Sequence, residues 1–115
     1  MALSEFEIKK CEKEIEAFLK VHRPPAHIRH KLDLGYRIEG QSIELFEIRP
    51  HLRDPSQKME ASVAKATFVK SRGCWKIFWQ RADLKWHGYE PAPNVKSFTD
   101  FLNIVAEDKY ACFFG

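Results

Sequence analysis

Long apolar runs are missing from this chain of 115 residues. Its first segment, MALSEFEIKKCEKEIEAF, becomes charged almost at once and so lacks the apolar run of about 7 to 15 residues that a signal peptide needs. No stretch of about 18 apolar residues follows that could cross a membrane. The sequence therefore predicts a cytoplasmic protein with no membrane partner.

Cysteine is scarce, and its spacing excludes two common uses. Cys11, Cys74 and Cys112 are odd in number, far apart and without a C-x-x-C pair, so neither a disulfide framework nor a zinc ribbon fits. We interpret these residues as small buried apolar side chains. A cysteine nucleophile would need a base beside it, and the sequence does not place one.

Excess charge of one sign is also lacking. Nineteen Lys and Arg against sixteen Asp and Glu leave a net charge of +3, which by itself does not indicate a nucleic-acid partner. Phosphate-binding loops, dinucleotide fingerprints and G-x-S-x-G elbows are missing too. We therefore assign no catalytic residue, no cofactor and no metal, and the sequence favours a binding protein over an enzyme.

What is present is the composition of one globular domain with a helix near each end. At this length a single domain, residues 1–115, can bury about two thirds of the surface of the unfolded chain. Ser4 and Glu7 make a capping box, and apolar residues then recur in steps of three and four, which predicts an amphipathic helix over residues 4–22. A second helix is predicted from Ser97 to near Glu107.

Between the helices the apolar pattern alternates, as it does in half-buried strands. In the second run the alternation changes parity between Leu45 and Phe46, which predicts a β-bulge. The polar, proline-containing residues 50–59 predict a long exposed loop. The fold class is therefore α+β, with an N-terminal helix, an antiparallel meander sheet of four to five strands and a C-terminal helix; the expected strands are 32–38, 43–49, 63–70, 75–81 and 84–89.

Two helices on one sheet face would bury that face and leave the other partly exposed. The apolar tail KYACFFG is expected to dock as well, on its own domain or on a second subunit, through Tyr110, Phe113 and Phe114. The expected core places Leu32, Leu34, Phe68 and one of Trp75 or Trp79 beneath helix residues Phe18, Phe101 and Val105.

The sequence resembles one family along nearly its whole length. The runs LDLGYRIEGQSIELFEIRP, AKATFVK and WQRADLKWHGYEP and the ending YACFFG are similar to those of a family of short bacterial proteins described only as a domain of unknown function, family number 3024. The resemblance supports a single domain. It implies no activity, cofactor or catalytic residue.

The segment CWKIFWQRADLKWHGYEP holds all three tryptophans among basic residues. On a strand over 75–81, side chains at odd and even positions point to opposite faces of the sheet. One of these two sets is therefore expected in the core, and the other places aromatic rings among basic side chains on the second face. Sheets that bind single-stranded nucleic acid combine these features, although packing within the core or in an interface is the more common cause of the same pattern.

A second basic run, HRPPAHIRHK at 22–31, contains no acid. It is either a solvated connector or a contact for phosphate. If this connector and the loop 50–59 lie at one sheet edge, they form a groove for a polyanion. The candidate polyanion-binding residues come from the tryptophan-containing segment, from the run 22–31 and from Arg72, just before the first of them: Arg23, Arg29, Lys31, Arg72, Lys76, Phe78, Arg81 and Lys85.

Three function classes stay open at this stage. The leading hypothesis is a small binding module for single-stranded nucleic acid or another polyanion. The alternative is a homo-oligomeric or partner-binding domain, a homodimer for example, that uses the exposed sheet face or the tail. A distant third is a metal-dependent hydrolase, since Asp33, Glu44 and Glu47 with Arg49 lie on adjacent strands, with Asp33 and Glu47 expected on one side of the sheet.

Overall fold

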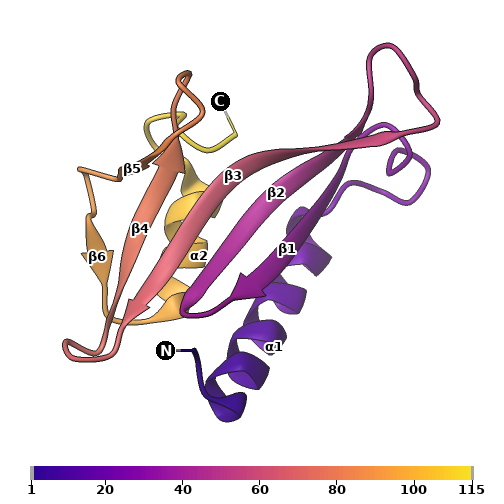
Figure 1. Ribbon diagram of the computed structural model, residues 1–115. Coiled ribbons are helices and arrows are strands. Elements are labelled where there is room, and N and C mark those ends of the chain that lie inside the picture. The colour runs from indigo at the N-terminus through magenta and orange to yellow at the C-terminus, as the bar shows by residue number, and fades with distance from the viewer. Residues whose placement is uncertain (1, 115) are drawn as a thin grey trace.

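A computed structural model describes residues 2–114 as one antiparallel sheet with both helices on the same face (Figure 1). This confirms the α+β class. Neighbouring strands follow the chain in the order β1 to β5, so the predicted meander is confirmed, and β6 pairs with β4 beside β5. The elements are α1 (Glu5–His22), β1 (Asp33–Glu39), β2 (Ser42–Pro50), β3 (Lys58–Val69), β4 (Cys74–Gln80), β5 (Trp86–Gly88), β6 (Asn94–Val95) and α2 (Phe98–Glu107).

Side-chain caps define the start of both helices. The Ser4 hydroxyl accepts the N–H of Glu7 at 3.1 Å and the Glu7 carboxylate accepts the N–H of Ser4 at 3.0 Å, so the predicted capping box is present. The Ser97 hydroxyl accepts the N–H of Asp100 at 3.1 Å in the same way. α1 ends at Arg23, whose extended backbone suits a residue before proline.

The register shift lies at the predicted place, but its extra residue belongs to the neighbouring strand. Leu45 pairs with Ala64 and Phe46 with Ser62, so Val63 on β3 is the unpaired residue. Side chains along β2 alternate between the two faces without interruption. The apolar pattern of the sequence changes parity because Phe46, although apolar, lies on the sheet face away from the helices. Gly35 on β1 leaves space for the Phe46 ring there, since a Cβ at Gly35 would come within 2.8 Å of it.

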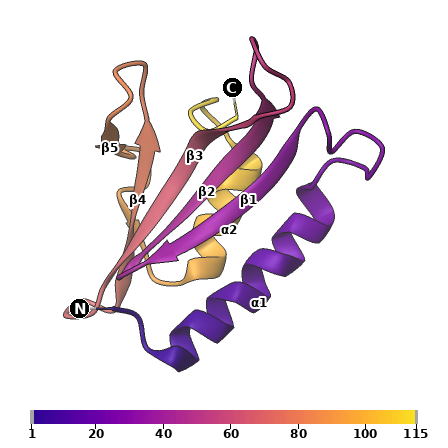
Figure 2. The same cartoon turned by 45° about the vertical axis from the view of Figure 1, so that its right-hand side comes forward.

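Most of the segment 50–59 is the predicted exposed loop, since residues 51–57 form the turn between β2 and β3 (Figure 2). The strands extend further than predicted at its borders: β2 continues to Pro50 and β3 begins at Lys58, before the predicted strand 63–70, so a two-stranded ribbon leads into the turn. The ribbon projects beyond the helices, and its β3 side chains at 58–61 are exposed. Its polar composition therefore reflects exposure on both faces, while the backbone hydrogen bonds of the hairpin maintain the strands.

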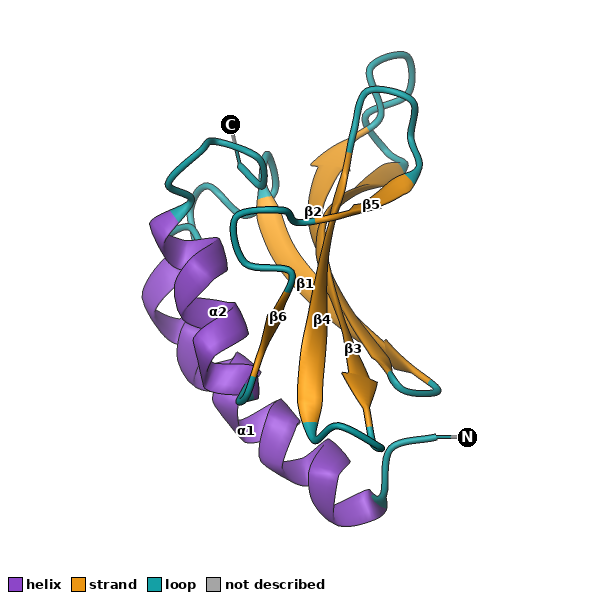
Figure 3. Ribbon diagram, turned by 90° about the vertical axis from the view of Figure 1, so that its left-hand side faces the viewer, coloured by secondary structure: helices purple, strands orange, loops and turns teal. Residues whose placement is uncertain are grey.

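The core lies between the helices and one face of the sheet (Figure 3). Trp75 is buried, with ring centroids 5.0 Å from Phe68 and 5.1 Å from Phe98. The predicted helix residues Phe18, Phe101 and Val105 are buried too. Leu32, Leu34 and Phe68, predicted to be buried, are only half-buried. Leu32 and Leu34 lie at the end of the sheet near the start of β1.

The tail docks on its own domain through one ring. Phe113 is buried, 4.9 Å from the ring of Tyr89, whereas Tyr110 and Phe114 remain 56% and 40% exposed. Asp108 ends α2 in the left-handed region, and its carboxylate accepts the N–H groups of Phe113 and Phe114 at 3.0 and 2.9 Å. This turn directs the tail back to the sheet.

Candidate functional site

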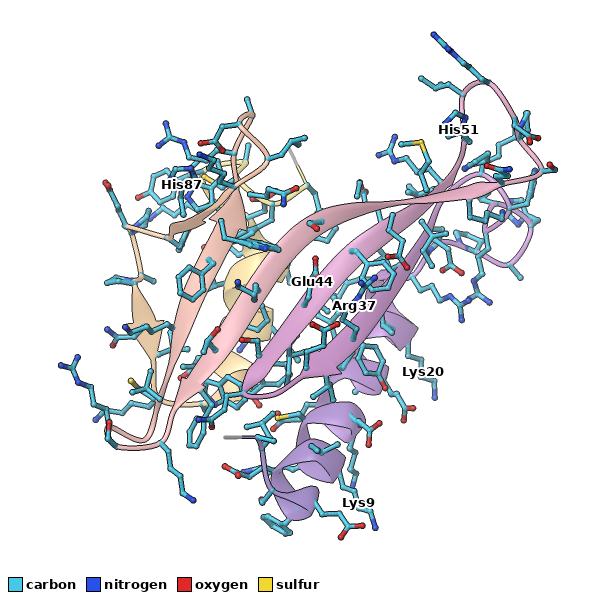
Figure 4. The ribbon with its side chains drawn as sticks, in the orientation of Figure 1. Lys9, Lys20, Arg37, Glu44, His51 and His87 are labelled. Atoms are coloured by element: carbon cyan, nitrogen blue, oxygen red, sulfur yellow. The ribbon has the colours of Figure 1, made fainter. Side chains whose placement is uncertain are left out.

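The two faces of the sheet have opposite character. Ile43, Ala66 and Ile77 are cross-strand partners, are fully buried and face the helices. The next row along the strands, Arg37, Glu44, Lys65 and Phe78, faces the other way, because side chains alternate along each strand. Figure 4 shows Arg37 and Glu44 on that face, in front of the sheet. We call it the open face, since neither helix covers it.

A cluster of two rings and two lysines occupies the β3–β4–β5 side of the open face. The Lys65 Nζ lies 5.1 Å from the centroid of the Phe78 ring and 4.9 Å from that of Trp86, within cation–π range. Both rings are half-buried, so part of each stays accessible to solvent. Lys76, two residues before Phe78 on β4, shares their face and is exposed. We call Lys65, Lys76, Phe78 and Trp86 the open-face cluster.

The turn between β4 and β5 brings Trp86 to this cluster. The Asp83 carboxylate accepts the N–H of Lys85 at 2.9 Å, and Leu84 takes a left-handed backbone with φ of 63°. The chain then returns with Trp86 opposite Gln80. Trp86 is therefore diagonal to Phe78 on the same face.

On the β1–β2 side of the open face, the basic side chain is already paired with acids. The Arg37 guanidinium lies over the Phe46 ring at 4.6 Å and is paired with Glu44 and Glu60. Glu44 also accepts the Ser62 hydroxyl at 2.6 Å. In the part of the chain that the structure describes, Lys65 and Lys76 have no such carboxylate partner. The free positive charge of this face is thus concentrated in the open-face cluster.

Only two of the sequence-predicted residues, Lys76 and Phe78, lie on the open face. Arg72 lies in the turn before β4 and Lys85 in the loop after it, so these two are near opposite ends of the strand. Arg81 is on the helix side, with its guanidinium 5.5 Å from the centroid of the Trp79 ring.

The remaining predicted residues belong to the connector between α1 and β1. Arg23 donates two hydrogen bonds of 2.6 Å to Asp33, and the Arg29 Nε donates to the Pro24 carbonyl at 2.8 Å. Lys31 is exposed. The connector does lie beside the β2–β3 turn, since the Lys58 ammonium donates to the His30 carbonyl at 3.2 Å. Figures 1 and 2 show both segments beyond the start of β1, away from β4.

The sequence missed Lys65, and it named Trp86 only as one of several rings. Lys65 stands between Ala64 and Ala66 on β3, both fully buried. A lysine between two small apolar residues of a strand indicates the outward face, which is a signal that could have identified it. Its proximity to Phe78 could not be inferred, because it depends on the pairing between strands.

The acidic residues do not converge. Asp33 pairs with Ile48 in the ladder, whereas Glu47 pairs with Leu34, so the expectation that Asp33 and Glu47 share a face is wrong. Glu47 contacts Arg49 at 3.1 Å, and Glu44 belongs to the Arg37 network. Within residues 2–114, no three His, Cys, Asp or Glu side chains are arranged to hold a metal ion.

Burial works against an activated thiolate at Cys11 and Cys112. Cys11 is buried, which raises the pKa of its thiol to about 11. Cys112 is half-buried beside Arg81 and Tyr89 in a cleft of about 360 Å³, and burial raises the pKa of its thiol as well. Cys74 is half-buried on β4, so the expectation of buried cysteines is confirmed for Cys11 and is wrong for Cys74 and Cys112, which are only half-buried.

Asp33 is expected to make the stability of the protein depend on acid pH. The hydrogen bonds from Arg23 lower the pKa of this carboxyl, burial opposes them, and the N–H of Leu34 lowers the pKa further. A group whose pKa is lower in the folded state than its unfolded value of about 3.9 stabilises the fold above that value and loses this effect as the pH falls through the folded pKa.

We therefore expect Asp33→Asn to reduce the free energy of unfolding by about 1 kcal/mol or less at pH 7, since the Arg23 side chain is 40% exposed. The parent and the variant should converge as the pH falls below the folded-state pKa of Asp33, because the carboxyl is then protonated in both states. Urea unfolding at neutral and at acid pH measures the difference, and a gap that stays constant with pH would contradict this role.

Comparison with known proteins gives a family but no activity. A family model described as a domain of unknown function (DUF3024) matches residues 3–115. No curated protein and no solved structure matches the chain. Among the described residues, neither helix has the length and apolar character required to cross a membrane.

Proposed function

The chain belongs to the DUF3024 family, whose function is unknown, and we propose from its geometry that it is a bacterial, cytoplasmic binding module for single-stranded nucleic acid. The open-face cluster carries this proposal. Two half-buried rings lie on a sheet face that no helix covers, with a lysine ammonium about equally close to both. Bases stack on such rings without strong sequence preference.

The charges around the rings support a nucleic-acid strand that follows β4. Lys76 precedes Phe78 on the same face, and Arg72 and Lys85 are exposed beyond the two ends of the strand. Lysine and arginine side chains along such a track can each meet a phosphate. Lys65 has a second role, because its ammonium lies against both rings; a phosphate that draws it away would expose ring surface for a base.

A titration of a fluorescently labelled oligothymidine tests the proposal. Phosphate contacts release counterions, so three or four of them should give a slope of about −2 to −3 in a plot of log affinity against log salt. Phe78→Ala or Trp86→Ala should weaken binding by roughly 5- to 150-fold, the equivalent of about 1 to 3 kcal/mol for one stacked base. Fluorescence anisotropy at low and moderate salt measures both effects.

Matched controls separate stacking from general charge. Lys65→Ala should weaken binding, whereas Lys20→Ala, which removes an exposed lysine from α1, should not (Figure 4). Tyr110→Ala removes an exposed ring of the tail as the control for the aromatic variants. The proposal fails if no binding occurs below about 100 micromolar at low salt. It fails equally if heparin binds as well and Phe78→Ala changes nothing, because that result describes only a charged patch.

A further inference from the structure

β1 is the edge strand of the sheet on the side opposite β5. The N–H of Leu34 donates to its neighbour's side chain, Asp33 Oδ1, at 2.8 Å, so it points away from β2. On the other side of β2, the Phe68 N–H donates to the Gln41 carbonyl. The backbone N–H and C=O groups of odd-numbered β2 residues therefore point to β3, and those of even-numbered residues point to β1. By alternation, the backbone N–H and C=O groups of Leu34, Tyr36 and Ile38 point outward from the edge of the sheet, away from β2.

The sequence of this edge is complementary to itself. Residues 31–39 read KLDLGYRIE, and their charges are opposite at positions equally distant from Gly35. If a second copy pairs antiparallel about Gly35, Asp33 lies opposite the partner's Arg37 on the open face. Leu34 lies opposite the partner's Tyr36 on the helix face. Beyond the strand ends, Lys31 comes next to the partner's Glu39.

Neighbouring registers lack this complementarity. A two-fold axis perpendicular to the sheet keeps both open faces on the same side of the joined sheet. Such an axis passes between one residue of β1 and the same residue of the partner. The pairing of the two strands can therefore shift only by two residues at a time, which moves the axis to the next residue of β1. Centring the pair on Leu34 places Lys31 opposite the partner's Arg37. Centring it on Tyr36 places Asp33 opposite the partner's Glu39. Both alternatives put like charges across from each other, which is destabilising.

We propose that two copies of this chain pair edge to edge through β1, antiparallel and centred on Gly35. Gly35 leaves the axis without a side chain, and each Phe46 ring, which covers its own Gly35, would lie beside the axis on the open face. Asp33 and Arg37 already have partners within the chain, so the pairing would join these ion pairs into one network across the axis. The two sheets would become continuous, with one open-face cluster toward each outer end.

Analytical ultracentrifugation over a concentration series, combined with amide hydrogen exchange by NMR, tests this pairing. We expect a reversible dimer in which the N–H groups of Tyr36 and Ile38 become protected as protein concentration rises. The N–H groups of Gly35 and Arg37 point to β2 and serve as controls, since they should be protected at every concentration. A chain that stays monomeric at all concentrations overturns the proposal, and so does a dimer that leaves Tyr36 and Ile38 unprotected.

Charge reversal tests the register. Lys31 and Glu39 are exposed and have no ion-pair partner among residues 2–114, so reversing either one leaves the fold intact. Lys31→Glu or Glu39→Lys should raise the dimer dissociation constant by roughly 2- to 30-fold, because each change affects two symmetric pairs. The double variant should restore it. Single reversals without effect would overturn the register centred on Gly35. The oligothymidine titration can be run at concentrations at which the protein is monomeric, so its outcome does not depend on whether the dimer forms.

Discussion

Replacing Trp75 with alanine is expected to lower the free energy of unfolding by about 3 to 5 kcal/mol. The side chain is 6% exposed and contacts two other rings, those of Phe68 and Phe98, between the sheet and α2. Its loss would leave a cavity that the surrounding strands cannot close. Since domains of this size are stable by about 5 to 15 kcal/mol, the variant should be close to unfolding at body temperature.

The same substitution at Trp86 is the matched control. Trp86 is half-buried on the open face and contacts Lys65 rather than the core, so Trp86→Ala should cost about 1 kcal/mol. Urea unfolding monitored by far-ultraviolet circular dichroism measures both variants. Equal losses would mean that the two faces do not differ in the way that the packing indicates. The control also verifies that a binding defect of Trp86→Ala comes from a folded protein.

These two tryptophans illustrate what the sequence could predict. The alternation in the segment 75–81 correctly separates Trp75 and Ile77 from Lys76 and Phe78, because side-chain direction in a strand is a local property. Both helices could be predicted for the same reason, since their caps and their apolar stripes are encoded within a few residues.

What the sequence could not predict depends on pairing between strands. A parity change within β2 indicated an irregular ladder, but the extra residue is Val63 on β3. Which strand of a pair carries the bulge is decided by packing on both faces, and one strand does not contain that information. The early start of β3 at Lys58 was not predicted for a related reason: its first residues, 58–61, are exposed, so their composition resembles that of a loop.

The candidate site was predictable only in part. Phe78 and Lys76 follow from alternation along one strand. Lys65 joins them through the register of β3 with β4, and Trp86 through a turn whose geometry depends on the left-handed backbone of Leu84. Conversely, Arg23 looked like a free cation in the sequence, although Asp33, ten residues later, binds it. A basic residue's availability therefore depends on acids that the fold brings to it.

The two adjacent phenylalanines of the tail should differ sharply when each is replaced. Phe113→Ala is expected to lower the free energy of unfolding by about 2 to 4 kcal/mol, somewhat less than for a core ring because the chain end can relax. Phe113 is 8% exposed and packs against Tyr89, which is itself buried. Phe114 is 40% exposed, so Phe114→Ala should cost less than about 1 kcal/mol.

Thermal unfolding of the two variants, together with a chain truncated after Lys109, measures the contribution of the tail. The truncated chain should resemble Phe113→Ala, because it removes the same ring along with the N–H groups that Asp108 holds in place. If Phe113→Ala and the truncation both keep the melting temperature of the parent, the tail does not stabilise the domain. If instead Phe114→Ala is the more damaging change, the exposed ring must be covered in solution, and light scattering would then show whether a second copy covers it.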